Sequence, residues 1–165
     1  MWYAILGAVL LAGDQILKYW VVTHLAVGES VPFLPGFMQL TRLHNYGAAW
    51  SSFSGRTVLL VVFTAVLLAA VALLLIKKVV RHWTGITACT LILSGGIGNI
   101  IDRIVHGYVV DMFDLQLFSY PVFNLADCCV VLGAILGGIY YLFLYEKYDK
   151  KKKESDHAHD PSDPS

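Results

Sequence analysis

Two aspartates in apolar surroundings, Asp111 and Asp127, are the residues of this chain best suited to chemistry. Asp111 follows Tyr108-Val109-Val110, and Asp127 lies in the apolar segment that begins near Val122. An ionisable side chain at the centre of a membrane helix costs about 2.5–3.5 kcal/mol on insertion scales, so such residues usually mark a function. Two neighbouring carboxyls cannot both ionise, and one keeps its proton. The pair would then supply a base and an acid for the attack of water on an amide carbonyl.

Six further polar residues stand in apolar segments: Asp14, Lys18, Asn99, Asp102, Arg103 and Asn124. Asp14 and Lys18 are four residues apart, so they share one helix face. Gly95, Asn99 and Asp102 are spaced at i, i+4 and i+7, so they form one stripe on a helix. Asp14 and Lys18 could be an ion pair that only joins two helices, or they could support an acidic site.

The spacing of the charges predicts which carboxyls are neutralised. We expect the aspartates at 14 and 102 to pair with the cations nearest in sequence, Lys18 and Arg103. Asp111 and Asp127 are then left without an obvious cation. Their titration would belong to the pair rather than to either residue.

Two alternatives concern the pair itself. Asp114 competes with Asp111, because it lies three residues later in the same segment. We favour Asp111, because the apolar residues before it would hold it at the membrane boundary. Asn124 and Asp127 also have the spacing of a capping box, and an acidic side chain suits a helix N-terminus. Asn124 could serve both the cap and the site.

The composition indicates an integral membrane protein. Hydrophobic residues make up 57% of the 165 residues, and charged residues only 15%, against about 25% charged residues in soluble domains. We expect a mainly α-helical membrane domain over residues 1–148 and a disordered cytoplasmic tail over 149–165. The four predicted transmembrane spans are approximately 3–22, 58–76, 86–104 and 122–144.

The basic residues predict the orientation of these spans. The link after the second span and the tail after the fourth hold eight of the twelve Lys and Arg residues. Positive-inside logic places both termini in the cytoplasm, and a basic run beside an apolar span is not a nucleic-acid site. In this orientation the polar residues named above all lie near the outer leaflet.

The two outer links, 24–56 and 106–120, differ in pattern. Residues 37–43 alternate between apolar and polar side chains, which predicts a strand or hairpin on the membrane surface. The shorter link at 106–120 is predicted to be an interfacial loop.

Several other classes of site are disfavoured. The three cysteines lie in apolar segments and do not have the spacing of a disulfide framework or a zinc site. H-E-x-x-H is absent, and neither Ser54 nor Ser94 has a plausible base on its face. We therefore expect no metal and no cofactor. A small proton-coupled transporter and a non-catalytic scaffold remain alternatives, although a transporter predicts polar residues through the full depth of the bundle.

Five short motifs follow one another from the first span to the fourth: Asp14-Gln15-x-x-Lys18, His44-Asn45-x-Gly47-Ala48-Ala49-Trp50, Gly95-Gly96-x-Gly98-Asn99-x-x-Asp102-Arg103, Val109-Val110-Asp111 and Phe123-Asn124-x-Ala126-Asp127. In this order they resemble the lipoprotein signal peptidase family, also called signal peptidase II. The resemblance implies an aspartic endopeptidase of the bacterial inner membrane that cleaves prolipoproteins just before a diacylglyceryl-modified cysteine.

The resemblance also implies roles for single residues. Asp111 and Asp127 match the family's catalytic pair, and Asn45 joins the supporting residues together with the six polar residues named above. An extracytoplasmic β-cradle would accompany the four helices, in keeping with the strand expected near 37–43. The implied partners are lipid-modified signal peptides and membrane lipids, and the implied site faces the outer leaflet.

Overall fold

The computed structural model describes residues 1–47 and 56–150. The Ala48-Ala49-Trp50 part of the second motif, Ser54, and residues 151–165 of the predicted tail lie outside the described residues.

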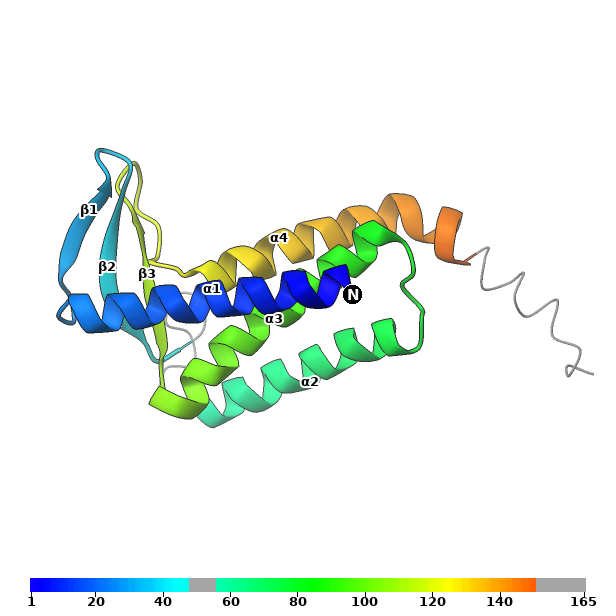
Figure 1. Ribbon diagram of the computed structural model, residues 1–165, viewed down its shortest axis with the longest axis horizontal. Coiled ribbons are helices and arrows are strands. Elements are labelled where there is room, and N and C mark those ends of the chain that lie inside the picture. The colour runs from blue at the N-terminus through cyan, green and yellow to red at the C-terminus, as the bar shows by residue number, and fades with distance from the viewer. Residues whose placement is uncertain (48–55, 151–165) are drawn as a thin grey trace, which may run out of the picture.

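Four long helices dominate the fold (Figure 1): α1 (Trp2–His24), α2 (Thr57–Ile76), α3 (Trp83–His106) and α4 (Leu125–Ile139), which continues as the π-helix η2 (Tyr140–Lys150). Each of the four, α4 together with η2, is long and apolar enough to cross a membrane. The predicted mainly helical membrane fold is confirmed.

Local signals explain where α3 and α4 begin and end. The His82 side chain accepts a hydrogen bond from the backbone of Thr84 at the start of α3, and Gly107 ends this helix in the left-handed region at φ 79°. Asn124 caps α4, so this helix begins at Leu125 rather than near 122. We expected the tail to begin at Asp149, but the helical segment extends through Lys150 and Asp149 is buried.

Helix α3 is the centre of the bundle, because α1, α2 and α4 all pack against it. Small residues allow these close approaches. A Cβ at Gly95 would collide with the backbone oxygen of Ala126 in α4. One at Gly133 would lie 2.9 Å from the backbone oxygen of Ala88. The chain therefore brings α3 and α4 together through residues that have little or no side chain.

A three-stranded antiparallel sheet lies at one end of the bundle, in the order β1 (Ser30–Leu34), β2 (Met38–Asn45) and β3 (Val109–Leu115). The strand predicted near 37–43 corresponds to β2. The predicted loop at 106–120 needs correction, because its residues 109–115 form β3. Buried backbone groups need hydrogen-bond partners, and β3 finds them by pairing with β2.

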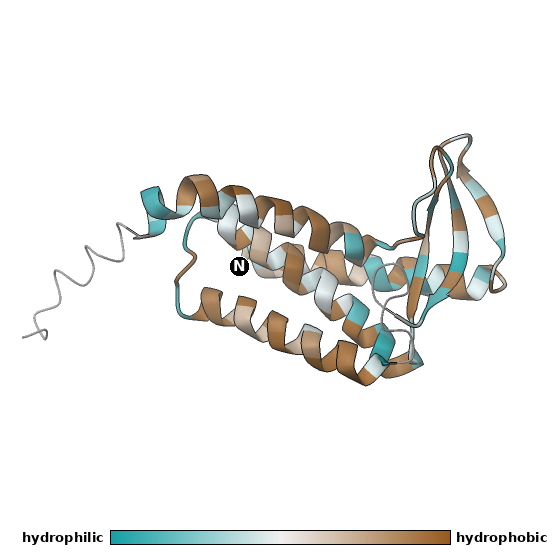
Figure 2. Ribbon diagram, turned by 180° about the vertical axis from the view of Figure 1, so that it is seen from behind, coloured by the Kyte–Doolittle hydropathy of each residue, from teal (hydrophilic) through white to brown (hydrophobic). Residues whose placement is uncertain are grey.

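An apolar cluster fixes the sheet to the bundle. Val21 and Leu25 at the end of α1 pack with Val110 and Met112 of β3, and all four side chains are buried. Figure 2 shows the same boundary as a change from largely hydrophobic helices to a sheet with many hydrophilic residues. The cluster therefore holds the residues that precede and follow Asp111 against α1.

Candidate active site

Asp111 is positioned by a local irregularity of the sheet. It pairs with Leu43 in β2, directly after the register shifts between Leu40 and Leu43. Such bulges re-aim side chains and are common beside active sites. The Asp111 side chain is 1% exposed. Its two carboxylate oxygens accept hydrogen bonds from Asn45 at 2.9 Å and Asn124 at 2.7 Å.

Asp127 lies in the first turn of α4 and completes a capping box. The Asn124 side chain accepts from the Asp127 backbone at 2.8 Å, and the Asp127 carboxylate accepts from the Asn124 backbone at 3.2 Å. The second Asp127 oxygen accepts from the Asn99 amide at 2.8 Å. Asn124 therefore caps the helix with its oxygen and binds Asp111 with its nitrogen, so a single side chain connects both aspartates.

Hydrogen bonds determine the orientation of the Asn99 amide. Its oxygen accepts from the Lys18 ammonium at 3.0 Å and from the Asn124 side chain at 3.2 Å. Because both partners are donors, the Asn99 nitrogen must point the other way, toward Asp127. Asn99 thus connects Lys18 of α1 to the Asp127 carboxyl at the start of α4.

Lys18 is the cation that neutralises the buried carboxylates behind the pair. It lies 2.8 Å from Asp14 and 3.0 Å from Asp102. The predicted pairing of Asp102 with Arg103 is therefore wrong. Consecutive residues on a helix point about 100° apart, so Arg103 does not share a face with Asp102.

The two carboxylates bound by Lys18 also hold backbone segments of the site. Asp102 accepts from the Val110 backbone at 3.0 Å, directly before Asp111. Asp14 accepts from the Ala126 backbone at 2.9 Å, directly before Asp127. Gly98 leaves room for Asp14, because a Cβ there would lie 2.7 Å from an Asp14 oxygen. This buried cluster therefore sets the position of both aspartates of the pair.

Arg103 extends from α3 toward the start of the undescribed segment. Its guanidinium donates to the backbone oxygen of Asn99 at 3.2 Å and to that of Gly47 at 2.8 Å. It also lines a cavity of about 400 Å³ together with both aspartates. Arg103 therefore brings a positive charge into the cavity that holds the acidic pair.

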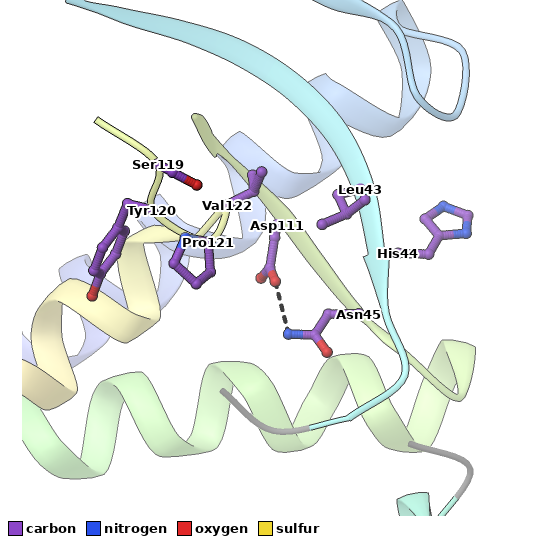
Figure 3. A pocket seen from close by; sticks show the side chains of 8 residues that line it. All are labelled: Leu43, His44, Asn45, Asp111, Ser119, Tyr120, Pro121 and Val122. Atoms are coloured by element: carbon purple, nitrogen blue, oxygen red, sulfur yellow. Dashed lines mark hydrogen bonds between the residues drawn. The ribbon is translucent and has the colours of Figure 1, made fainter. Parts of the chain in front are cut away.

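Two cavities meet at Asp111. The one that contains Arg103 and Asp127 extends along α2, α3 and α4, and its lining includes Thr64 and Val130. A second cavity of about 400 Å³ lies on the side of the sheet, and Figure 3 shows its lining. In this view Asp111 and Asn45 are joined by their hydrogen bond, with Tyr120 and Pro121 on the other side of the carboxyl.

The surroundings of Asp111 change its proton affinity. Burial raises the pKa of the Asp111 carboxyl from 3.8 to about 7, and the negative charge of Asp127 adds to this rise. The hydrogen bonds from Asn45 and Asn124 oppose it by stabilising the ionised form. At neutral pH the Asp111 carboxyl is therefore close to the midpoint between its protonated and ionised forms.

Comparison with known proteins identifies the family. A sequence model described as "Signal peptidase (SPase) II" matches residues 6–143. The lipoprotein signal peptidase of Enterococcus faecalis is 40% identical over 151 residues, which is 92% of this chain and 93% of the relative. That of Lactococcus lactis subsp. lactis is 38% identical over 143 residues, or 87% of this chain and 91% of the relative.

The chain belongs to the signal peptidase II family.

Two solved bacterial membrane enzymes support this assignment at the level of the fold. Both were obtained by the in meso method, one at 2.3 Å and one at 1.9 Å resolution. The match to the first has a TM-score of 0.80 at 31% identity, and it covers 91% of this chain and 92% of the solved chain. The match to the second has a TM-score of 0.78 at 33% identity, and it covers 86% of this chain and 93% of the solved chain. As a signal peptidase II, the protein is a membrane protease of the aspartic type that processes lipoprotein precursors.

Asp114 lies apart from the pair formed by Asp111 and Asp127. Its carboxylate accepts from Gln39 at 2.6 Å and from Thr41 at 3.5 Å, both in β2. Asp114 also lies three positions after Asp111 on β3, so the two side chains leave opposite faces of the sheet. Asp114 lines neither of the two cavities that contain Asp111.

Sequence reasoning assigned no role to several residues that line or support the candidate site of this signal peptidase II. Gln15 donates to Asp14 and Asp102, both at 3.2 Å, so it links the two carboxylates around Lys18. Tyr120 and Pro121 line both cavities that contain Asp111. Thr64 lines one of them from α2. The sequence could have indicated Thr64, because it is the only polar residue of α2 after Thr57.

Proposed function

We propose that Asp111 and Asp127 hydrolyse the scissile peptide bond of a prolipoprotein with one activated water and no covalent intermediate. The observation that carries this proposal is the Asn124 side chain, which binds Asp111 and receives the backbone hydrogen bond of Asp127. Both carboxyls thereby face one cavity. Such a pair can take a proton from water and deliver another to the leaving group.

The proton inventory of the pair supports this mechanism. The ionised carboxyl accepts a proton as the water oxygen attacks the carbonyl carbon. The protonated carboxyl then donates its proton, so that the peptide nitrogen leaves as an amine and the acyl part leaves as a carboxylic acid. A carboxyl with a pKa of about 7, such as that of Asp111, exchanges protons readily in both directions at neutral pH.

The amides and the arginine around the pair orient the reacting groups in this proposal. Asn45, Asn99 and Asn124 hold the carboxyls in place, which supplies part of the orientation that catalysis requires. Arg103 lines the same cavity and would stabilise the negative charge that develops on the carbonyl oxygen. These roles explain why polar residues converge on one end of the bundle.

The substrate's signal helix would lie in the cavity along α2, α3 and α4, whose lining includes Thr64, Val130 and Val131. The peptide bond would then pass Asp111, and the chain would be cut directly before a diacylglyceryl-modified cysteine. The diacylglyceryl chains would stay in the outer leaflet. This placement uses both cavities that meet at Asp111.

The dependence on lipid modification is directly testable. Two precursors should be compared that differ only in the diacylglyceryl group on the cysteine, with the purified protein in lipid nanodiscs. We expect cleavage of the modified precursor and a product whose new N-terminus is the modified cysteine, as measured by mass spectrometry. Equal rates for both precursors would show that the enzyme does not recognise the lipid.

In the proposed orientation the protein spans the inner membrane with both termini on the cytoplasmic side and the site at the outer leaflet. A single cysteine in the 24–47 part of the first outer link, in a background without the three native cysteines, should react with a membrane-impermeant reagent in intact cells. A cysteine at 78–82 should react only after the membrane is opened. The reverse pattern would place the carboxyl pair on the cytoplasmic side.

The distribution of polar residues does not favour a transporter. In α2 the only polar residues are Thr57 and Thr64. A proton pathway requires polar groups through the full depth of the bundle. Thr90 and Ser94 are also buried in α3, but their hydroxyls donate to the backbone of their own helix. The buried cluster of Lys18, Asn99 and Asp102, which contains charged side chains, lies behind the acidic pair near the sheet.

A further inference from the structure

A further cavity lies at the end of the bundle opposite the sheet, where α2 is linked to α3 and α4 continues as η2 (Figure 1). Its volume is about 430 Å³. Its walls are almost entirely apolar or aromatic, with Val71 and Leu74 from α2, Ala88 and Ile92 from α3, and Tyr141 from η2. The cavity shares no residue with the two that contain Asp111.

The rim of this cavity is basic. Lys77 and Lys78 are exposed and directly precede Val79 and Val80, which line the cavity. Arg81 follows on the same link. Figure 2 shows hydrophilic residues on this link next to the hydrophobic ends of the helices. In the described part of the chain, two acids belong to the same end of the bundle: Asp149 is buried and accepts from the backbone of Arg81 and His82, and Glu146 is exposed and follows Tyr145 of the cavity lining.

An apolar cavity below a basic rim fits an amphiphile with an anionic head and an aliphatic tail. We propose that this cavity binds one acyl chain of an anionic phospholipid, whose phosphate lies against Lys77 and Lys78. Clusters of basic residues at the ends of transmembrane helices attract anionic head groups. Tyr141 and Tyr145, whose rings stack with centroids 5.9 Å apart, form an aromatic wall of the kind found at membrane interfaces.

The charge of the rim distinguishes this occupant from the substrate. A signal peptide begins with a positively charged segment ahead of its apolar part. Lys77 and Lys78 would repel that positively charged segment if the signal helix extended into this cavity. The same two charges attract a phosphate. The site is therefore assigned to a lipid, and it does not depend on the mechanism proposed for the carboxyl pair.

Two adjacent glycines provide a matched pair of variants. A Cβ at Gly137 would lie 3.8 Å from the Cβ of Ala88, an ordinary contact, and Gly137 lines the cavity. A Cβ at Gly138 would meet no atom within 4 Å, and Gly138 does not line the cavity. Gly137→Leu should therefore fill the cavity without a backbone collision, whereas Gly138→Leu adds the same side chain outside it.

Native mass spectrometry of the purified full chain in detergent tests the proposal. The protein is titrated with phosphatidylglycerol and, separately, with phosphatidylcholine of the same acyl chains. We expect a preference for phosphatidylglycerol. Gly137→Leu should weaken the binding of both lipids about 16-fold if its side chain excludes two methylenes, because each excluded methylene contributes about fourfold. Gly138→Leu should bind like the parent.

The head-group arm uses Lys77→Gln combined with Lys78→Asn. Asn is chosen because Lys78 has a φ of 51°, which Asn tolerates well. Each basic residue near an anionic lipid contributes about fivefold, so the preference for phosphatidylglycerol should fall about 25-fold. Lys147→Gln removes an exposed charge at the same end of the bundle, outside the cavity lining, and should preserve the preference.

Two results would overturn the proposal: equal binding of the two lipids by the parent, or parental lipid binding by Gly137→Leu. The second result, if accompanied by a loss of signal-peptide affinity in the same variant, would assign the cavity to the substrate. If Gly137→Leu fails to fold, Gly137→Ala adds only the tolerated Cβ and should weaken lipid binding by a smaller factor.

Discussion

Asp111→Asn and Asp127→Asn should each abolish nearly all prolipoprotein cleavage while the protein still folds and inserts. Asn keeps the shape of Asp but accepts through only one of its two terminal atoms, so each variant loses one of the two hydrogen bonds that the carboxylate accepts. The loss of one such bond costs about 1–3 kcal/mol, which still allows the protein to fold. Each variant nevertheless removes a group that must both take and give a proton. General acid–base groups contribute about 10²–10⁴-fold in rate, and a loss of this size is expected.

The double variant provides a further check on this prediction. Because the two carboxyls act as one unit, Asp111→Asn with Asp127→Asn should be scarcely slower than either single variant. Turnover of a diacylglyceryl-modified precursor by purified protein is the measurement. The matched control is Asp114→Asn, which changes a carboxyl bound to Gln39 in the same strand and should retain most of the activity.

Two outcomes would contradict the assignment of the pair. Loss of cleavage in Asp114→Asn with survival of Asp111→Asn would move the site to the other face of β3. Full activity in all three single variants would end the proposal of carboxyl catalysis.

Lys18→Met should have the largest effect on folding. Lys18 lies within 3.0 Å of both Asp14 and Asp102, and all three side chains are buried. Removing one member of a buried ion pair typically costs about 3–5 kcal/mol, because the remaining charge is left uncompensated away from water. Here two carboxylates lose their cation. We expect a collapse of the folded yield and, with it, of activity.

A charge-neutral variant tests the physical reason for this effect. Adding Asp14→Asn and Asp102→Asn to Lys18→Met removes every charge of the cluster and should restore a substantial part of the folded yield. Size-exclusion chromatography and thermal unfolding in detergent provide the readout. A triple variant as unstable as Lys18→Met would mean that packing of the Lys18 side chain, rather than its charge, stabilises the bundle.

Smaller losses are expected where a single hydrogen-bond partner is removed. Asn99→Ala removes one donor to Asp127 and the oxygen that accepts from the buried side chains of Lys18 and Asn124. An unpaired buried group typically costs about 1–3 kcal/mol. Folded yield and activity should therefore fall together in this variant. A fully stable but inactive Asn99→Ala protein would place Asn99 in the chemistry rather than in its support.

The amino-acid sequence by itself determined the four apolar helices and the residue types of the acidic site. Hydropathy is a property of contiguous residues, so a span such as 57–76, with no charged side chain, is recognisable without knowledge of its neighbours. The capping box of Asn124 and Asp127 is equally local, since three residues separate its members. The family resemblance added Asn45, which no local pattern indicated.

Only the tertiary structure decided how these residues are connected. Asp102 forms its ion pair with Lys18 and not with the adjacent Arg103. Asn45 donates a hydrogen bond to Asp111, which lies 66 positions later in the sequence. The strand at 109–115 forms because β2 offers it a partner, whereas its own apolar sequence is equally compatible with an interfacial loop. Such contacts depend on the relative positions of helices and strands, and a buried charge selects its partner by distance in space rather than by proximity in the chain.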